Sequence, residues 1–196
     1  MVTITNVKVY DLIESVIASG NAMRITPVEY SDEEFQKGLK RMVRLVKSSK
    51  NTDVHCHDNA LTGIRVSFDI TYPQYWAPEF QRYHFADIVT SSSKMHRLSK
   101  MDLSLACNKY VDMNIIKIVQ EKIDAYNENP NYTNFMEMIS NCPLGLELFM
   151  RVSTNYKQLQ TIYHQRKNHK LKEDWGEFCR MIENLPYFDE LILGKE

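Results

Sequence analysis

Regular alternation of apolar and polar side chains between Leu61 and Tyr72 is the feature that most constrains this fold. The segment is rich in β-branched and aromatic residues, and a period of two is typical of a strand with one buried face. The apolar positions are Ile64, Val66, Phe68 and Ile70, and the polar positions are Arg65, Ser67, Asp69 and Thr71. The pattern therefore predicts a half-buried strand.

Other segments carry strand or helix patterns of their own. Ser31 and Glu34 form a capping box ahead of apolar residues at helical spacing, and Asp112 and Asn155 are placed to cap two more helices. The expected strands are Val2–Tyr10 and Leu146–Ser153, and the expected helices are Leu12–Ala18, Ser31 to the turn at 48–51, Asp112 to about Tyr126, Thr133–Ser140, Asn155 to about Arg166, and Leu171–Ile182. In the helix after Asp112, the inward side chains would be Ile115, Ile116, Val119 and Ile123. We expect an α+β fold, an antiparallel sheet with helices packed on one face, in a single domain of residues 1–196.

One more helix is predicted to begin near Pro78, since proline is tolerated in a first helical turn. The side chains that it would carry include Arg82, Tyr83, His84 and Asp87. It would end in the hydroxyl-rich turn of residues 90–94, Thr-Ser-Ser-Ser-Lys. Hydroxyls, backbone N–H groups and a cation together are the composition of an anion-binding loop, in which Ser91 and Ser92 hold a phosphate and Lys94 neutralises it. The region is therefore a candidate site for a phosphorylated small molecule.

Composition and charge exclude several classes of protein. The chain has 196 residues, 43% of them hydrophobic, and a net charge of −1 from 24 basic and 25 acidic residues. This balance does not supply the electrostatic attraction on which nucleic-acid binding depends. No apolar run approaches a membrane span, and the first residues lack a signal-peptide pattern. We expect a cytoplasmic protein without nucleic-acid or membrane partners.

Cysteine and histidine spacing gives no metal site. The cysteines, which are Cys56, Cys107, Cys142 and Cys179, include no Cys-x-x-Cys pair, so neither a zinc ribbon nor a disulfide scaffold is indicated, and a reducing cytosol fits best. His55 and His57 could chelate a metal ion, but no carboxylate or cysteine pair at ligand spacing completes the set.

The region that follows His57 resembles the flavin-dependent thymidylate synthases. That family has a histidine before a strand, a helix that ends in Arg-His-Arg, and a turn of the form Ser-x-Asn-Glu-x-Ser-x-Arg-Tyr. In an ungapped comparison, His57 matches the histidine and Phe68 a strand phenylalanine, and residues 82–84 match the triplet. Ser92 and Lys94 match the last serine and arginine of the turn.

A second, distant segment is similar to the same family. Residues 154–159, Thr-Asn-Tyr-Lys-Gln-Leu, resemble its Val-Asn-x-Arg-x-Leu, and Arg166 matches an arginine one helix later. Two separated segments in register are harder to obtain by chance than one short motif.

The resemblance implies a homotetramer whose sites lie between subunits and bind FAD, a uridine nucleotide and methylene-tetrahydrofolate. The implied reaction puts a methyl group on uracil carbon 5, with hydride supplied through the reduced flavin. Arg166 matches the arginine that would stabilise the charge developing at a pyrimidine carbonyl, which makes it, with Ser92, a candidate catalytic residue. The implied nucleotide-binding residues are Arg82, Ser91, Ser92, Lys94 and Arg166, and the implied cofactor-binding residues are His57, Arg82, Tyr83, His84 and Asn155.

Departures from the family pattern leave other functions open. Tyr83 and His84 replace the histidine and second arginine of the triplet, and Val89 and Thr90 stand where the turn has Asn and Glu. Lys94 keeps the charge of an arginine but loses its bidentate fork. The alternatives are a non-catalytic protein that sequesters or senses a nucleotide-derived molecule, and an assembly protein with a relic site.

Each candidate residue also has a structural interpretation. His57 could cap a turn, His84 and Tyr83 could fill core, and Arg166 could complement a helix C-terminus through the macrodipole. A different register would place residues 95–97 on the Arg-His-Arg triplet and residues 108–110 on the Ser-x-Arg-Tyr turn. We prefer the first register because it aligns several matches without gaps.

Overall fold

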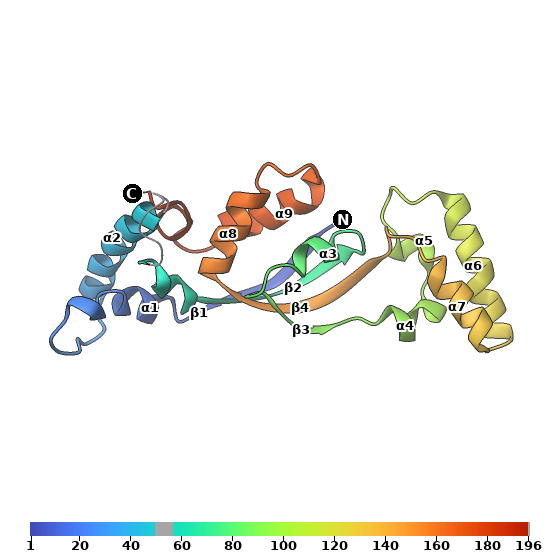
Figure 1. The fold of residues 1–196 in the computed structure, drawn as a ribbon, viewed down its shortest axis with the longest axis horizontal. Helices are drawn as coiled ribbons and strands as arrows, with labels where there is room; N and C mark the ends of the chain where they lie inside the picture. The colour runs from blue at the N-terminus through green and yellow to red at the C-terminus, as the bar shows by residue number, and fades with distance from the viewer. Residues whose placement is uncertain (50–56, 196) are drawn as a thin grey trace.

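The computed structural model describes residues 1–49 and 57–195. An antiparallel four-stranded sheet of order β1-β2-β4-β3 runs through the middle of an elongated molecule (Figure 1). Its strands are β1 (Thr3–Tyr10), β2 (Arg65–Pro73), β3 (Asp87–Ser91) and β4 (Glu147–Asn155). The two central strands pair from Arg65 opposite Asn155 to Pro73 opposite Glu147.

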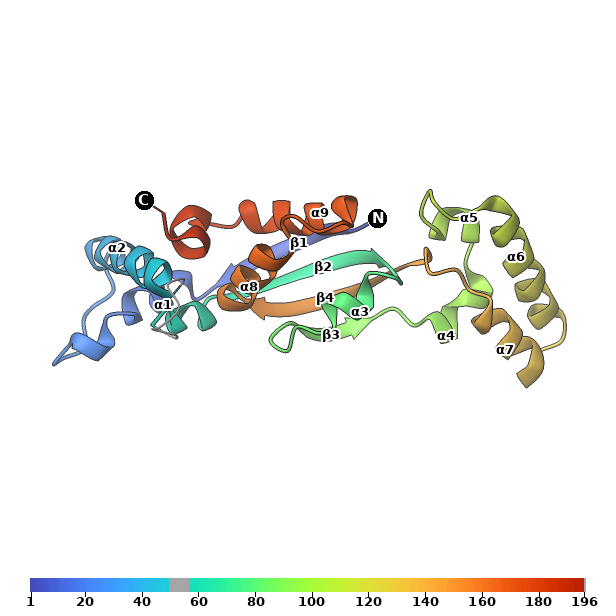
Figure 2. The ribbon, with the colours of Figure 1, turned by 45° about the horizontal axis from the view of Figure 1, so that its top comes forward.

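Helices lie over the sheet and at both of its ends. α1 (Leu12–Ala18), α2 (Asp32–Ser49) and the π-helical segment η4 (Asp189–Leu193) lie at one end (Figure 1). α4 (Lys94–Arg97), α5 (Leu103–Ala106), α6 (Met113–Glu128) and α7 (Tyr132–Ser140) lie at the other, and α3 (Ala77–Phe80), α8 (Tyr156–Arg166) and α9 (Lys172–Glu183) lie along the sheet (Figure 2). The 3-10 turns are η1 (Asn21–Met23), η2 (Asn59–Thr62) and η3 (Leu98–Lys100).

One face of the sheet is buried under helices, as the alternation in the sequence predicts. The four apolar positions of the first predicted strand, Ile64, Val66, Phe68 and Ile70, are all buried. The Phe68 ring meets Phe178 of α9 edge-on, with 5.7 Å between centroids. On the opposite face, Asp69 pairs with Arg151 across β2 and β4 at 3.0 Å, and both remain partly exposed. The expected α+β fold, an antiparallel sheet with helices on it, is confirmed.

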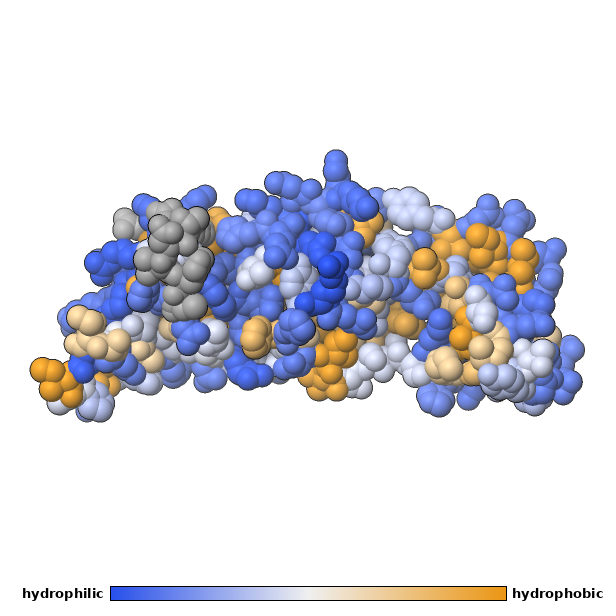
Figure 3. Space-filling model, viewed as in Figure 1, coloured by the Kyte–Doolittle hydropathy of each residue, from blue (hydrophilic) through white to orange (hydrophobic). Residues whose placement is uncertain are grey.

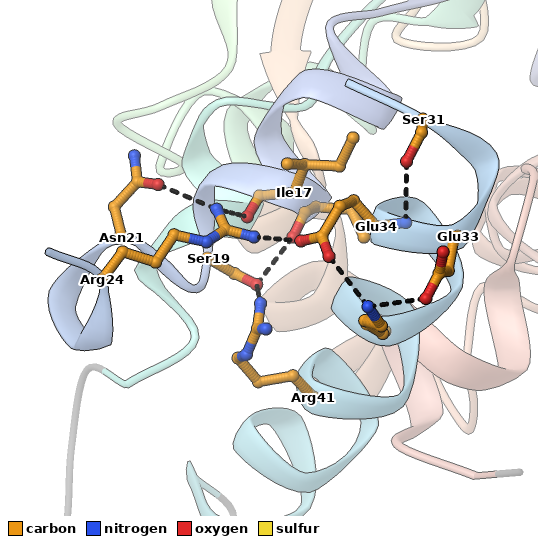
Figure 4. A network of polar contacts seen from close by, with 10 residues as sticks. Ile17, Ser19, Asn21, Arg24, Ser31, Glu33, Glu34 and Arg41 are labelled. Carbon is orange, nitrogen blue, oxygen red and sulfur yellow. Dashed lines mark hydrogen bonds and ion pairs between the residues drawn. The ribbon is translucent and has the colours of Figure 1, made fainter. Parts of the chain in front are cut away.

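Most predicted helices lie where the sequence places them. α1 has the predicted bounds, and the side chains of Asp112 and Asn155 accept the expected capping hydrogen bonds. The capping box at α2 is only half formed. The Ser31 hydroxyl accepts from the Glu34 N–H at 3.3 Å, but the Glu34 carboxylate turns to Arg24 at 2.6 Å and to Lys37 instead (Figure 4).

The same close-up shows why the turn between α1 and α2 is held in place (Figure 4). Arg24 also donates to the Ile17 carbonyl at 2.9 Å and to Asn21 at 3.0 Å. Arg41 of α2 donates to the Ser19 hydroxyl at 3.2 Å, so part of the basic face of α2 binds the chain itself.

The helix predicted from Pro78 through residue 87 is wrong. α3 ends at Phe80, a turn follows, and Asp87–Ser91 forms the edge strand β3 against β4. The Tyr83 and Ala86 N–H groups donate to the carbonyls three residues earlier, at 3.0 and 3.2 Å, so the chain turns instead of continuing the helix. Phe85 is held against β4 and α8: its carbonyl accepts from the Thr154 hydroxyl at 2.8 Å, and its N–H donates to Gln158 at 3.4 Å. Pairing with β4 then favours the extended form of the β-branched segment that follows.

Two smaller predictions need correction. The strand β2 begins at Arg65 rather than Leu61, because residues 59–62 form the 3-10 turn η2. Ile115 does not face inward with Ile116, since its side chain is 45% exposed. Figure 3 shows apolar surface over the α4–α7 end of the molecule. Exposed apolar residues of these helices and their connections include Met95, Leu105, Tyr110, Met113, Ile115, Ile118, Tyr132 and Met136.

Within residues 1–49 and 57–195, no helix combines the length and the apolar content that crossing a bilayer requires. The same residues contain no cluster of three His, Cys, Asp or Glu side chains able to hold a metal ion. The candidates His55 and Cys56 lie outside the described ranges.

Candidate functional site

Arg82, Tyr83 and His84 meet Arg166 at one cavity, although about eighty residues separate them in the sequence. We call it the arginine cavity; its volume is about 440 Å³. The turn after α3 supplies residues 82–85, and successive turns of α8 supply the others. The remaining lining residues are Phe85, Gln158, Thr161 and Gln165.

The guanidinium of Arg166 is held on several sides. Its Nε donates to the Tyr83 hydroxyl at 2.7 Å, and its Nη1 donates to Glu79 Oε2 at 2.9 Å. It also lies over the ring of Trp175, 4.5 Å from the centroid, and is 14% exposed. The Tyr83 hydroxyl in turn donates to Gln165 at 3.0 Å. Arg166 is therefore a cation held in place. Of its three side-chain nitrogens, Nη2 makes no hydrogen bond to any described residue.

Glu79 is a residue of this site that the sequence analysis missed. Besides Arg166, its Oε2 accepts from the indole N–H of Trp175 at 2.8 Å, and His169 Nε2 lies 3.4 Å away. His169 Nδ1 accepts from the Leu171 N–H at 3.2 Å, which places the histidine proton on Nε2, toward Glu79. In the sequence, Glu79 resembles any acidic residue in a first helical turn, so no local signal marks it.

The serine-rich segment lines a different cavity, on the face of the sheet opposite the helices. We call it the serine cavity; its volume is about 620 Å³. Its lining residues are Thr5, Asp69, Thr71, Thr90, Ser91, Ser92, Ser93, Arg97, Phe149, Met150 and Arg151. Hydroxyl groups and two arginines in one hollow form a donor set suited to an anionic group such as a phosphate.

Ser92 continues the β3–β4 ladder at this cavity. Its N–H donates to the Phe149 carbonyl at 2.8 Å, and its hydroxyl oxygen accepts from the Phe149 N–H at 3.0 Å. The hydroxyl proton is left to donate to a ligand. Asp69, on the neighbouring strand, accepts from Asn6 at 2.6 Å and from Arg151, and these hydrogen bonds hold the pKa of its carboxyl below the ordinary value.

Arg97 and Arg151 were also missed by the sequence analysis. Arg151 lies on the polar side of the alternation in β4, which predicts exposure but not a site. Arg97 was considered only in the alternative register. Lys94, the cation expected for the phosphate, opens α4 and is not among the residues that line the serine cavity.

His57 and Asn155 line neither cavity. His57 is exposed in the turn before η2, beside Asp58, whose buried carboxylate pairs with Lys157 of α8 at 2.6 Å. The Asn155 side chain accepts from the Gln158 N–H at 2.9 Å and so caps α8. Because α8 carries Gln158, Gln165 and Arg166, Asn155 acts on the arginine cavity through the start of this helix.

The capping role of Asn155 leads to a prediction. Asn155→Ala should lower the unfolding free energy by about 1 kcal/mol, because the first turn of α8 loses its acceptor. Urea denaturation of the wild type and the variant measures this change. Asn131→Ala is the matched control, since Asn131 caps α7 in the same way at 3.0 Å, far from α8 in sequence. Asn155→Asp should restore most of the loss; unchanged stability of Asn155→Ala would contradict the capping role.

Sequence comparison finds no match among protein-family models or curated proteins. Solved structures do match over nearly the whole chain. The flavin-dependent thymidylate synthase ThyX of Helicobacter pylori, complexed with FAD and dUMP, superposes with a TM-score of 0.72 at 16% identity, covering 97% of this chain and 96% of that one. A second structure of that ThyX with FAD and dUMP gives 0.73 at 16% identity, covering 98% and 96%.

A third similar structure is the UMP/dUMP methylase PolB of Streptomyces cacaoi bound with 5-Br dUMP. Its TM-score is 0.61 at 9% identity, and the alignment covers 93% of this chain and 86% of PolB. The fold is therefore that of the flavin-dependent thymidylate synthases, with a strongly divergent sequence. The resemblance drawn from the two separated sequence segments is confirmed at the level of the fold.

Proposed function

We propose, from this shared fold, that the chain is a divergent relative of ThyX that binds a pyrimidine nucleotide and FAD and transfers a one-carbon unit to uracil carbon 5. The observation that carries the proposal is the meeting of Arg166 with residues 82–84 at the arginine cavity. The ThyX structures of this fold contain FAD and dUMP.

In this proposal, Arg166 polarises the pyrimidine. A guanidinium next to a ring carbonyl stabilises the negative charge that develops when carbon 5 acts as a nucleophile. Fixation by Tyr83 and Glu79 means that the group needs little reorganisation during the reaction. Ser92 would donate its free hydroxyl proton to the nucleotide phosphate, with Ser91 and Arg97 beside it in the serine cavity.

A flavin fits the exposed cations at the arginine cavity. Arg82 and His84 are both exposed there, and an arginine fork suits a diphosphate or a ring carbonyl. We assign these two residues to FAD, and His57 to the edge of the flavin or folate site. Bound FAD, once reduced, would supply the hydride, and methylene-tetrahydrofolate would supply the carbon.

We also propose a homotetramer with sites between copies. On one chain, the arginine and serine cavities share no lining residue, and the serine cavity opens on the uncovered face of the sheet. A second copy on that face would close the cavity. Exposed apolar residues at the α4–α7 end supply further surface for assembly (Figure 3). Analytical ultracentrifugation at several protein concentrations tests this: a tetramer is expected, and a monomer at all concentrations would contradict it.

A non-catalytic nucleotide-binding protein is the second candidate function. The ion pair of Arg166 with Glu79 favours it, because the carboxylate offsets the charge that would polarise the ring. Tyr83, which stands for a histidine of the family triplet, is likewise bound to Arg166 and Gln165. Such a protein would keep the nucleotide pockets and lose the transfer reaction.

The visible absorption spectrum of the purified protein, followed by thermal-shift assays with dUMP, distinguishes these functions. A flavin band, stabilisation by dUMP, and formation of thymidylate with methylene-tetrahydrofolate and a chemical reductant would support the enzyme. A colourless protein that dUMP still stabilises, by about 2.7 kcal/mol at a hundredfold excess over the dissociation constant, would support the second function. A protein that takes up neither flavin nor any pyrimidine nucleotide would refute both.

A further inference from the structure

We infer that Glu79 is the positioning residue of the arginine cavity: it fixes Arg166 so that the terminal Nη2 takes an uncharged, carbonyl-bearing ring, while Arg82 and His84 of the same cavity are left for the flavin. The inference rests on the proposed function in taking that ring to be the base of a nucleotide. It adds a residue, Glu79, that neither the fold nor the sequence motifs assign.

The first argument is the convergence of donors on Glu79. One carboxylate oxygen accepts from Arg166 at 2.9 Å and from Trp175 at 2.8 Å, with His169 Nε2 at 3.4 Å. These donors come from α8, from α9 and from the turn that joins them. Glu79 on α3 therefore fixes the position of α8 relative to α9 at the point where Arg166 leaves its helix.

The second argument is which atoms of Arg166 remain available. Nε is bound to Tyr83 and Nη1 to Glu79, while the guanidinium plane lies against the Trp175 ring. Among the described residues, Nη2 makes no hydrogen bond, so it is the nitrogen that a ligand in the arginine cavity can meet. A planar group with fixed edges selects a planar acceptor at a defined angle.

The third argument is charge. Glu79 offsets the charge of Arg166 within 2.9 Å, and an anionic group placed at Nη2 would also meet the carboxylate. A ring carbonyl accepts from Nη2 without this repulsion. The serine cavity, with Arg97 and the hydroxyls of Ser91 and Ser92, has the donors that a phosphate needs. In the proposed homotetramer, the base would then lie in the arginine cavity of one copy and the phosphate in the serine cavity of another, since on one chain the two cavities share no lining residue.

Calorimetric titration with two probes tests the inference: dUMP, and 2-deoxyribose 5-phosphate, which lacks the base. Glu79→Ala should weaken dUMP binding about tenfold or more, since a hydrogen bond that holds a charged group is lost. Affinity for 2-deoxyribose 5-phosphate should not change. Glu79→Gln keeps an acceptor oxygen and should recover part of the loss. Glu121→Ala, on the exposed face of α6, is the control and should bind both probes as the wild type does.

A double-mutant cycle separates positioning from a general structural effect. If Glu79 acts through Arg166, the double variant Glu79→Ala/Arg166→Ala should bind dUMP no more weakly than Arg166→Ala alone. Additive losses, or a Glu79→Ala protein with unchanged dUMP affinity, would overturn the inference. Equal weakening of both probes would also overturn it, since it would show a loss of fold rather than of base recognition.

The urea midpoints of the wild type, the two single variants and the double variant test, without any ligand, whether Glu79 holds Arg166 in place. Each single variant leaves its partner unpaired in a partly buried site, so the double variant should unfold at a urea concentration no lower than the less stable single variant. A wild type that binds no dUMP would refute the proposed function, and the urea cycle would still decide whether Glu79 holds Arg166. Additive shifts of the urea midpoint would refute the interaction between Glu79 and Arg166.

Discussion

Trp76→Ala is expected to lower the unfolding free energy by about 3–5 kcal/mol, the range for removing a large aromatic side chain from a core. Trp76 is fully buried. Its ring stacks on Phe80 with 4.9 Å between centroids, and lies 4.8 Å from Trp175 and 5.9 Å from Phe178. The cavity left behind would lie beside Trp175, whose other contacts include Arg166. Urea denaturation followed by circular dichroism measures the change.

Trp76→Phe is the matched control for this prediction. The indole N–H of Trp76 is buried and has no hydrogen-bond partner within residues 1–49 and 57–195, so phenylalanine removes an unsatisfied donor while keeping most of the ring. The expected cost is below about 1.5 kcal/mol, since partial loss of volume is offset by removal of that donor. A Trp76→Ala protein as stable as Trp76→Phe would show that the ring contacts contribute little.

The two central strands and the helices packed on the sheet could be predicted, because residues close together in the sequence carry the pattern of each. Alternation along β2 and β4 identifies the buried faces, and capping residues identify where α6 and α8 begin. β3 could not be predicted, because its five residues are exposed and show no buried face. Its conformation depends on hydrogen bonds to β4, which lies more than fifty residues further along the chain. Pairing of this kind leaves no periodic pattern in the shorter strand.

Some residues of the candidate site could likewise be predicted from the sequence, and others could not. Arg82, Tyr83, His84 and Arg166 were identified through the resemblance to the flavin-dependent thymidylate synthases, and the structure brings them together. Glu79 was missed because its role depends on hydrogen bonds from Arg166 of α8 and Trp175 of α9, which are 87 and 96 positions away in the sequence. Arg97 and Arg151 were missed for a similar reason, since their shared cavity forms only when the sheet and α4 are in place. Residue type suggests a chemistry, whereas the partners depend on the tertiary fold.

Arg166→Ala is expected to weaken dUMP binding by about 10- to 100-fold, because a hydrogen bond to a charged group contributes about 1.5–3 kcal/mol. The loss follows from removal of Nη2, the nitrogen available to a ring carbonyl in the arginine cavity. If the protein catalyses the transfer, the rate with saturating substrates should also fall, since the developing charge loses its stabilising cation. Calorimetric titration measures the first effect and thymidylate formation the second.

Two further variants make this prediction specific. Arg180→Ala removes an exposed arginine of α9 that pairs with Glu177 of its own helix, and binding should not change. Arg166→Lys keeps the charge but loses the planar fork that reaches Tyr83 and Glu79 together, so its affinity should lie between those of the wild type and Arg166→Ala. Circular dichroism should confirm that each variant is folded before binding is compared. Unchanged binding and turnover in a folded Arg166→Ala protein would contradict the assignment of Arg166 to the ligand.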